Sequence, residues 1–260
     1  MKIDTNTAAV VTGGASGLGR ASAEALAAAG VKVAIFDLNE EGGQEVAKSV
    51  GGLFCKVDIM DERSVISGFE EARSAHGQER ILVHCAMVSR RGKTLSFDKD
   101  AGKLKRLKTE DYAYGVNGIL VASYRMASLS AEGMADLEPL EDGERGVITL
   151  TSSVAAQDGQ IGQVTYASAK AGVNGLVLPM ARDLMDIGIR VNSIMPGIFA
   201  TPLMLGAKPQ VLESLAASVP FPKRLGNPDE FGSLVMELVR NGYLNGQTIR
   251  LDGAIRMAPR

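Results

Sequence analysis

The chain has 260 residues, and its 28 Lys and Arg against 30 Asp and Glu give a formal net charge of −2. This balance argues against bulk electrostatic binding to nucleic acid. Two cysteines and two histidines exclude a disulfide framework and the common Cys/His zinc sites, so we expect no metal. No apolar run reaches the roughly 18 residues of a membrane span, and residues 1–7 lack a signal or transit pattern. A cytoplasmic protein that binds no membrane is therefore expected.

Short apolar runs alternate with longer helical stretches along the whole chain. Strands are predicted at residues 8–12, 31–36, 53–57, 81–85, 147–151, 190–194 and 247–251. Helices are predicted at residues 18–29, 40–50, 62–76, 109–134, 164–186 and 228–241. The strands are too short and too continuously apolar for amphipathic helices, which indicates burial on both faces of a parallel sheet. The pattern predicts one α/β domain over residues 1–260, doubly wound with right-handed crossovers.

Two charged segments interrupt this regularity. Residues 90–108 carry eight basic and two acidic side chains, a net +6, and residues 132–144 carry six acids and no base. Both are expected to form surface loops or helix ends. Because the basic segment follows a predicted strand end, where open α/β sheets place ligands, it is a candidate to contact an anionic part of a substrate.

A glycine-rich turn follows the first predicted strand, in the run Thr12-Gly-Gly-Ala-Ser-Gly-Leu-Gly19. Glycines allow a tight turn and close approach of the backbone to a pyrophosphate, which then lies on free N–H groups at the positive end of the next helix. The dinucleotide-binding residues predicted here are Gly13, Ser16, Gly17, Leu18 and Gly19.

Two acidic residues follow the next predicted strands. A carboxylate at Asp37 can accept hydrogen bonds from the adenosine ribose hydroxyls and repels a 2′-phosphate, and its neighbours Leu38 and Asn39 offer no cation for such a phosphate. NAD is therefore favoured over NADP. Asp58, beside Ile59, is placed to hold the adenine amino group, although as an isolated Asp it could equally be a helix cap.

The candidate catalytic group is a tyrosine. Of the five tyrosines, only Tyr166 has a lysine four residues later, Lys170, on the same helical face. An ammonium and a cationic nicotinamide would lower the phenol pKa by about 3 units, equivalent to roughly 4 kcal/mol. Ser153, after a predicted strand, could bind the substrate oxygen. Asn117, unfavourable inside a helix, could hold a water that links Lys170 to solvent.

These residues together resemble the short-chain dehydrogenase/reductase family. The matching elements are the glycine-rich turn, Asp58, Asn117, Ser153, Tyr166-Ala-Ser-Ala-Lys170, and Pro196-Gly197 followed by Thr201. The resemblance implies a Rossmann fold of seven parallel strands with helices on both faces, and hydride transfer between NAD and an alcohol carbon. Residues 1–150 would form the cofactor half and residues 151–260 the catalytic and substrate half.

The same resemblance implies further cofactor-binding positions. The turn after residue 196 would lie near the nicotinamide, with Thr201 holding its carboxamide. The implied residues are Cys85, Ala86, Tyr166, Lys170, Pro196, Gly197, Ile198 and Thr201. One departure is visible: the family usually has Asn-Asn/Cys-Ala-Gly after the fourth strand, whereas this chain has His84-Cys-Ala-Met87. We expect a hydrogen-bonded core histidine at this point, and Met87 either crowds the ribose or lines a pocket.

The second half of the chain is similar to a narrower group, the type II 3-hydroxyacyl-CoA dehydrogenases. The similar stretches are residues 153–163, 181–184, 219–226 and 250–257. That group is known for oxidising 3-hydroxyacyl-CoA and also hydroxysteroids, and its typical assembly implies a homotetramer.

Residues 202–215 contain apolar side chains that either cover a greasy substrate as a lid or pack on the core. A lid beside the basic segment suits an acyl-CoA, which is the leading substrate. The alternative substrate is a hydroxysteroid or another bulky alicyclic secondary alcohol, which would use the lid without the basic segment. The alternative from another class is an NAD-binding scaffold or sensor without turnover.

Overall fold

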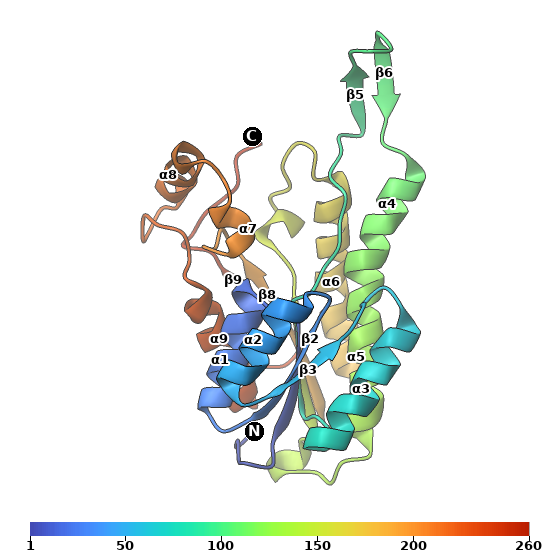
Figure 1. Cartoon of the computed structure of the whole chain (residues 1–260), viewed down its shortest axis with the longest axis vertical. Coiled ribbons are helices and arrows are strands. Elements are labelled where there is room, and N and C mark those ends of the chain that lie inside the picture. Colours follow the sequence, from blue (N-terminus) through green and yellow to red (C-terminus); the bar gives the residue numbers. More distant parts are fainter. Residues whose placement is uncertain (260) are drawn as a thin grey trace.

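The computed structural model of the chain describes residues 1–259. Its centre is a seven-stranded sheet with the order β3-β2-β1-β4-β7-β8-β9, in which every neighbouring pair is parallel (Figure 1). The predicted doubly wound α/β fold is confirmed. The strand order reverses between β1 and β4, and open sheets of this kind bind ligands at the carboxyl ends of the strands there.

The strands and helices lie close to their predicted positions. The strands are β1 (Ala8–Thr12), β2 (Lys32–Asp37), β3 (Leu53–Lys56), β4 (Ile81–His84), β7 (Gly146–Thr151), β8 (Ile189–Pro196) and β9 (Thr248–Leu251). The helices are α1 (Gly17–Ala28), α2 (Glu40–Val50), α3 (Glu62–His76), α4 (Thr109–Val116), α5 (Ala122–Ala135), α6 (Val164–Asp183), α7 (Pro202–Leu205), α8 (Pro209–Ser218) and α9 (Pro228–Arg240). No helix within residues 1–259 is both long and apolar enough to cross a membrane.

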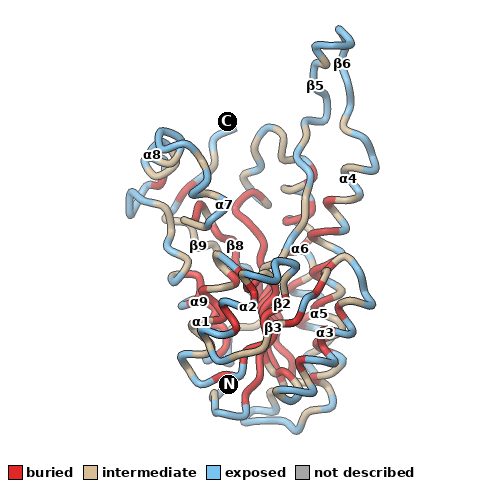
Figure 2. The backbone as a smooth tube through the Cα atoms, viewed as in Figure 1, coloured by how far each residue is buried: buried red, intermediate tan, exposed pale blue. Residues whose placement is uncertain are grey.

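Each face of the sheet carries its own hydrophobic core. Leu26 of α1, Val46 of α2 and Phe231 of α9 pack on one face. Phe69 of α3, Met126 of α5 and the apolar side of α6 pack on the other. The central strands are buried along their whole length (Figure 2). Burial on both faces explains their continuous apolar sequences.

The helix predicted at residues 109–134 is two helices joined by a π-helical turn at Asn117–Val121. The Gly118 carbonyl in this turn accepts a hydrogen bond from the Val88 N–H at 3.1 Å. A Cβ at Gly118 would lie 2.3 Å from the Val88 carbonyl oxygen, so only glycine fits. The wider turn therefore ties the chain after β4 to this helix pair.

The basic segment is on the surface as predicted, but it is a hairpin rather than a loop. Strands β5 (Leu95–Asp98) and β6 (Lys103–Arg106) pair antiparallel and project from the body beyond α4 (Figure 1). The Asp98 side chain accepts hydrogen bonds from two backbone N–H groups in the turn, and Gly102 has φ +62°. These turn contacts, which hydrophobic periodicity does not register, make the hairpin.

The acidic segment is also not wholly a solvated surface. It spans the end of α5 and a short 3₁₀ turn at Glu141–Gly143. At its end, the Glu144 carboxylate accepts two hydrogen bonds from the largely buried Arg190, at 2.8 and 2.9 Å, and lies 3.1 Å from the Met1 ammonium. Glu144 thus lies in a loop as expected and, in addition, its partly exposed carboxylate neutralises the two buried charges of Arg190 and Met1.

Candidate active site

The glycine-rich turn lies between β1 and α1, at the point where the strand order reverses. Gly13 has φ +66°, and a Cβ there would lie 2.8 Å from the Ala86 backbone nitrogen. A Cβ at Gly19 would lie 2.2 Å from the Gly13 carbonyl oxygen. The Ser16 side chain makes no capping hydrogen bond at the start of α1, which leaves this helix N-terminus to an external anion. The turn therefore fits the pyrophosphate of a dinucleotide.

Asp37 is held at the rim of the same turn. One of its carboxylate oxygens accepts from the Ala15 N–H at 3.1 Å and the other from the Asn39 N–H at 2.9 Å. Leu38 is more than half exposed, and the Asn39 side chain caps α2. A fixed carboxylate with uncharged neighbours fits an adenosine ribose that lacks a 2′-phosphate.

Asp58 and Ile59 lie in the turn between β3 and α3. The Asp58 carboxylate accepts from the Met60 N–H at 2.9 Å, whereas the side chain that caps α3 belongs to Asp61. The helix-cap alternative for Asp58 was therefore wrong. Ile59 is buried in the core, and its carbonyl accepts from Arg125 at 2.7 Å, so its side chain faces the protein interior.

The chain after β8 covers the glycine-rich turn. A Cβ at Gly17 would lie 3.2 Å from the Thr201 methyl group, so these two predicted cofactor residues are adjacent. Gly197 packs against Asp252 so closely that a Cβ would lie 2.8 Å from its Cα, and Ile198 is buried. Together with the Cys85 and Ala86 backbone, this loop encloses the cradle that the sequence predicted.

Ser153, Tyr166 and Lys170 gather beside this cradle, at the carboxyl end of β7 and on α6. The Ser153 hydroxyl accepts from the Ala155 N–H at 3.1 Å. The Lys170 Nζ lies 5.9 Å from the centroid of the Tyr166 ring and donates to the Thr151 carbonyl at 2.5 Å. Burial lowers the pKa of Lys170 to about 8. The three side chains that the sequence singled out are therefore brought together.

The protein alone does not lower the pKa of Tyr166. Burial raises the pKa of Tyr166 above its ordinary value, and the Ser153 hydroxyl and the Arg91 guanidinium act in the opposite direction. The expected lowering depends on the Lys170 ammonium together with a bound cationic nicotinamide, so it stays a prediction.

Asn117 begins the π-helical turn, which packs against α6. Asn117 is exposed in the structure of residues 1–259. A π-helical turn is often found at functional sites. The structure thus places Asn117 on the element next to Tyr166 and Lys170, and its water-holding role stays a prediction.

His84 is buried and only partly hydrogen-bonded. The Thr12 hydroxyl accepts from the Cys85 and Ala86 N–H groups, both at 3.1 Å, so its own proton is directed to His84 Nδ1 at 2.7 Å. Neutral His84 then carries its proton on Nε2, which is buried without a partner within the described residues. Burial, with a smaller effect of Lys170, lowers the pKa of His84 to about 3. The expected core histidine is confirmed, but one of its nitrogens is unsatisfied.

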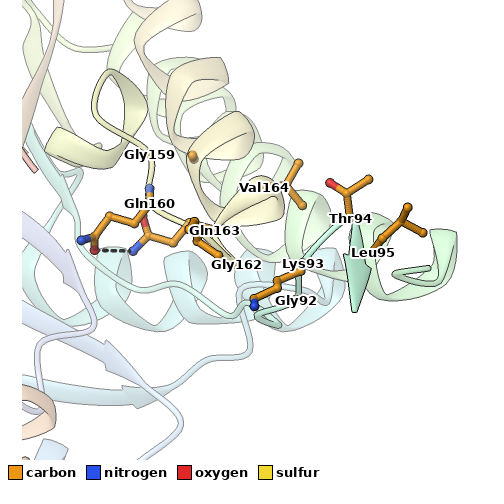
Figure 3. A pocket seen from close by; sticks show the side chains of 11 residues that line it. Gly92, Lys93, Thr94, Leu95, Gly159, Gln160, Gly162, Gln163 and Val164 are labelled. Carbon is orange, nitrogen blue, oxygen red and sulfur yellow. Dashed lines mark hydrogen bonds between the residues drawn. The ribbon is translucent and has the colours of Figure 1, made fainter. Parts of the chain in front are cut away.

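A cavity of about 370 Å³ lies between the base of the hairpin and the chain before α6 (Figure 3). Its walls are Gly92–Leu95, Gly159–Val164 and Ala167. Val164 and Ala167 belong to α6, the helix that also carries Tyr166, although Ser153, Tyr166 and Lys170 are not among the lining residues. Residues 1–259 contain no cluster of three His, Cys, Asp or Glu side chains that could hold a metal.

Sequence reasoning did not single out Thr12, Thr151 or Arg91. The Thr12 hydroxyl holds the backbone of Ala86, and the Thr151 carbonyl accepts a hydrogen bond from Lys170. The charge of Arg91 acts to lower the pKa of Tyr166. Threonine at strand ends is too common to be a signal, and the contact of Arg91 depends on how residues 88–94 cross the sheet. Only the net charge of the basic segment pointed toward Arg91.

Comparisons with known proteins agree with this geometry. The family model described as short chain dehydrogenase matches residues 7–211. The chain is 44% identical over 256 residues to the 3-hydroxyacyl-CoA dehydrogenase type-2 of Drosophila melanogaster, covering 98% of this chain and 99% of that one. It is 43% identical over 253 residues to the Homo sapiens protein of the same name, covering 96% and 95%.

A solved structure is similar as well. The crystal structure of 3-hydroxyacyl-CoA dehydrogenase type-2 from Mycobacterium avium has a TM-score of 0.91 and 40% sequence identity, and the match covers 100% of both chains. The chain therefore belongs to the short-chain dehydrogenase family, and it is an oxidoreductase of CH–OH groups that uses a nicotinamide cofactor.

The first prediction concerns acid stability. Because the pKa of His84 falls from an ordinary 6.5 to about 3, the unfolded state binds more protons between these pH values, and stability falls as the pH drops. Between pH 7 and pH 5 the wild-type protein should lose about 2 kcal/mol more unfolding free energy than the variant His84→Asn. Urea unfolding at both pH values measures this, with His76→Asn as the control at a half-buried histidine. Equal losses in wild type and His84→Asn would contradict the assignment.

Proposed function

We propose that the protein is an NAD-dependent dehydrogenase that oxidises 3-hydroxyacyl-CoA to 3-oxoacyl-CoA. The observation that carries the reaction is the placement of Ser153, Tyr166 and Lys170 beside a cradle that fits a dinucleotide. Asp37 supports NAD in particular, because its fixed carboxylate repels a 2′-phosphate. The half formed by residues 1–150 would hold the cofactor and the half formed by residues 151–260 the substrate.

In this proposal Tyr166 accepts the proton of the substrate hydroxyl. The Ser153 hydroxyl donates a hydrogen bond to the same substrate oxygen and keeps that oxygen close to the tyrosine. A nicotinamide bound in the cradle would accept the hydride, and its positive ring would favour the phenolate that the protein alone disfavours. Lys170, held by the Thr151 carbonyl, fixes the electrostatic surroundings of the tyrosine, and Asn117 holds the water through which protons exchange with solvent.

The hairpin and cavity support an acyl-CoA as substrate. Lys93 lines the cavity, and Lys103, Lys105 and Arg106 are exposed on β6 above it. Of the three, Lys105 forms an ion pair with Asp98, in which its Nζ lies 3.6 Å from a carboxylate oxygen. The phosphates of coenzyme A are matched by such cations.

The α7–α8 segment supports an apolar substrate portion. Met204 and Leu215 pack with Ile198 and Val219 in a small separate cluster, whereas Leu203 is 86% exposed. The segment thus combines both sequence alternatives, since one side packs on the protein and the other is free to cover a ligand.

The second candidate is a dehydrogenase of a hydroxysteroid or another bulky alicyclic alcohol. The exposed apolar side chains of α7 and α8 favour it, because they would contact such a substrate without the hairpin. A cofactor-binding scaffold is the third candidate, and the gathered catalytic residues argue against it. NADH production across panels of hydroxyacyl-CoA, steroid and alicyclic alcohols distinguishes the three.

We also propose that the protein forms a homotetramer. Tyr112, Tyr124 and Leu178 are exposed on α4, α5 and α6, and large apolar side chains on neighbouring helices are typical of subunit contacts. Sedimentation equilibrium measures the assembly state.

The second prediction tests the catalytic tyrosine. Tyr166→Phe removes the proton acceptor and keeps the ring, so turnover should fall by at least about 10³-fold. The NAD dissociation constant should change less than about twofold in a fluorescence titration. Tyr243→Phe, at a fully exposed tyrosine, is the control. Retained activity in Tyr166→Phe would refute the role of Tyr166.

The third prediction concerns cofactor choice. Asp37→Ser removes the charge that repels a 2′-phosphate, so the preference for NAD over NADP should fall by about tenfold or more. The ratio of kcat/KM for the two cofactors measures it, and Glu41→Gln, a charge removed from the first turn of α2, is the control. An unchanged ratio in Asp37→Ser would contradict the assignment of NAD to this carboxylate.

The fourth prediction tests the hairpin. Changing Lys103, Lys105 and Arg106 together to Gln should raise the KM for 3-hydroxyacyl-CoA about tenfold and leave the KM for a neutral secondary alcohol unchanged. The control changes Lys32, Lys48 and Arg240 to Gln, which are exposed cations at the start of β2 and at the ends of α2 and α9, outside the hairpin. Equal effects on both substrates would count against a coenzyme A site on the hairpin.

A further inference from the structure

Two stretches that resemble the type II group lie against each other in the fold, although almost a hundred residues separate them. One is the loop after Ser153, residues 157–162, which forms one wall of the cavity (Figure 3). The other is residues 250–257, which continue into residues 258–259, and residues 250–259 together are called the C-terminal segment. The catalytic chemistry described above uses neither stretch directly.

Four hydrogen bonds join the C-terminal segment to the cavity loop. Arg250 donates to the Gln157 side chain at 2.7 Å and to the Asp158 carboxylate at 2.8 Å. Farther along, the Gln160 side chain donates to the Ala258 carbonyl at 2.9 Å, and the Ile161 N–H donates to the Pro259 carbonyl at 3.0 Å. The loop is therefore held at both of its ends by the end of the chain.

The C-terminal segment is itself held in one conformation. Arg250 also bonds Asp252 at 2.7 Å and the Ile255 carbonyl at 2.9 Å, so most of its donors are occupied. Gly253 and Ala254 have φ of +60° and +65°, and such a value at a residue with a Cβ persists only where surrounding contacts determine it. The Ala254 N–H bonds the Asp252 carboxylate at 3.0 Å, which completes the tight turn. This turn bends the chain back toward the cavity loop.

The same segment contacts the proposed lid. Ile255 is 2% exposed and packs with Ile198 and Val219, and Met257 packs on the same cluster. That cluster includes Met204 of α7 and Leu215 of α8. One short stretch of chain therefore touches both the cavity wall and the segment that would close over a substrate.

The cavity loop has little of its own to hold its shape. Gly159 and Gly162 lie within it, and Gly162 has φ +86°. On the hairpin side the Gly92 N–H bonds the Gly162 carbonyl at 3.0 Å. Gln160 also bonds Gln163, through a backbone N–H at 3.0 Å and a side-chain contact at 3.4 Å, so the anchor at Ala258 fixes the orientation of both glutamines on the wall.

We propose that residues 258–259 act as positioning residues for the substrate, by clamping the cavity loop in the shape that accepts the acyl-CoA. This inference rests on the function proposed above, because it takes the cavity to be part of the substrate site. The contacts of residues 258–259 with the cavity loop involve no residue of the glycine-rich turn, so loss of the clamp should affect substrate binding and leave cofactor binding intact.

Truncation after Met257 tests the clamp, because it removes two carbonyl acceptors and keeps Arg250 and the packing of Ile255. Truncation after Pro259 is the matched control, since it keeps both acceptors. A third variant, Gln160→Glu, keeps the shape of the side chain and replaces its N–H donor with a carboxylate oxygen, which the Ala258 carbonyl oxygen repels. The readouts are amide hydrogen exchange of residues 157–163, the NAD dissociation constant, and KM and kcat with 3-hydroxyacyl-CoA.

The truncation after Met257 should speed amide exchange in residues 157–163 about tenfold and raise KM about tenfold, with kcat and the NAD dissociation constant within about twofold. Gln160→Glu should change exchange and KM in the same direction, and the control truncation should match wild type. Unchanged exchange in both test variants would overturn the clamp. Equal losses of kcat and NAD binding would also overturn it, because they indicate general unfolding.

The exchange measurement separates this inference from the proposed function. If the intact protein does not oxidise 3-hydroxyacyl-CoA, the proposed function fails whatever the variants show. Faster exchange in the truncated protein would still support the clamp of the loop, and the KM comparison is then made with the alcohol that the substrate panel identifies. Faster exchange with unchanged KM for that alcohol would overturn the positioning role.

Discussion

The hydroxyl of Thr12, at the carboxyl end of β1, is the contact on which the rest of the site depends. The Thr12 hydroxyl accepts hydrogen bonds from the N–H groups of Cys85 and Ala86 and donates its own proton to His84 Nδ1. These bonds turn the chain after β4 toward the glycine-rich turn. Gly13 must lack a Cβ because that chain then passes within van der Waals distance. The floor of the cofactor cradle and the path toward the hairpin both start from this turn. The accompanying cost is the His84 Nε2, which is buried without a protein partner within residues 1–259.

A second set of contacts makes the cofactor cradle and the proton-transfer site one rigid unit. The Thr151 hydroxyl donates to the Cys85 sulfur at 3.3 Å, and its carbonyl accepts from Lys170. The end of β7 thereby links the chain after β4 to α6, and the tyrosine is carried on the same helix one turn before the lysine. The substrate side is built differently. The hairpin, α7–α8 and the cavity loop lie outside this unit, and a few local hydrogen bonds and a small apolar cluster hold them. Substrate preference can therefore vary while the chemistry stays the same.

Sequence reasoning located most of the candidate site because its signals are local. Tyr166 and Lys170 share a helical face at a spacing of four residues, and Asp37 follows a strand by position alone. The effect of the protein alone on the pKa of Tyr166 had no local signal, because it depends on how deeply the tyrosine is buried and on the nearness of Ser153 and Arg91. The role of Asp58 as a cap was likewise decided by where α3 begins, and a one-turn difference moved the cap to Asp61. Arg91 carried no local signal of its proximity to the tyrosine.

The sequence by itself determined the order of strands and helices, the parallel sheet and the positions of the glycine-rich turn and of the catalytic pair. Each of these follows from periodicity or spacing within a few residues, where the chain has little choice. Only the tertiary structure decided the hairpin, the π-helical turn at Asn117, the ion pair of Glu144 with Arg190 and the contact of Ala258 with Gln160. These features arise where segments distant in sequence meet. The free energy that selects them comes from desolvation and from hydrogen bonds to specific backbone groups, which no local pattern records.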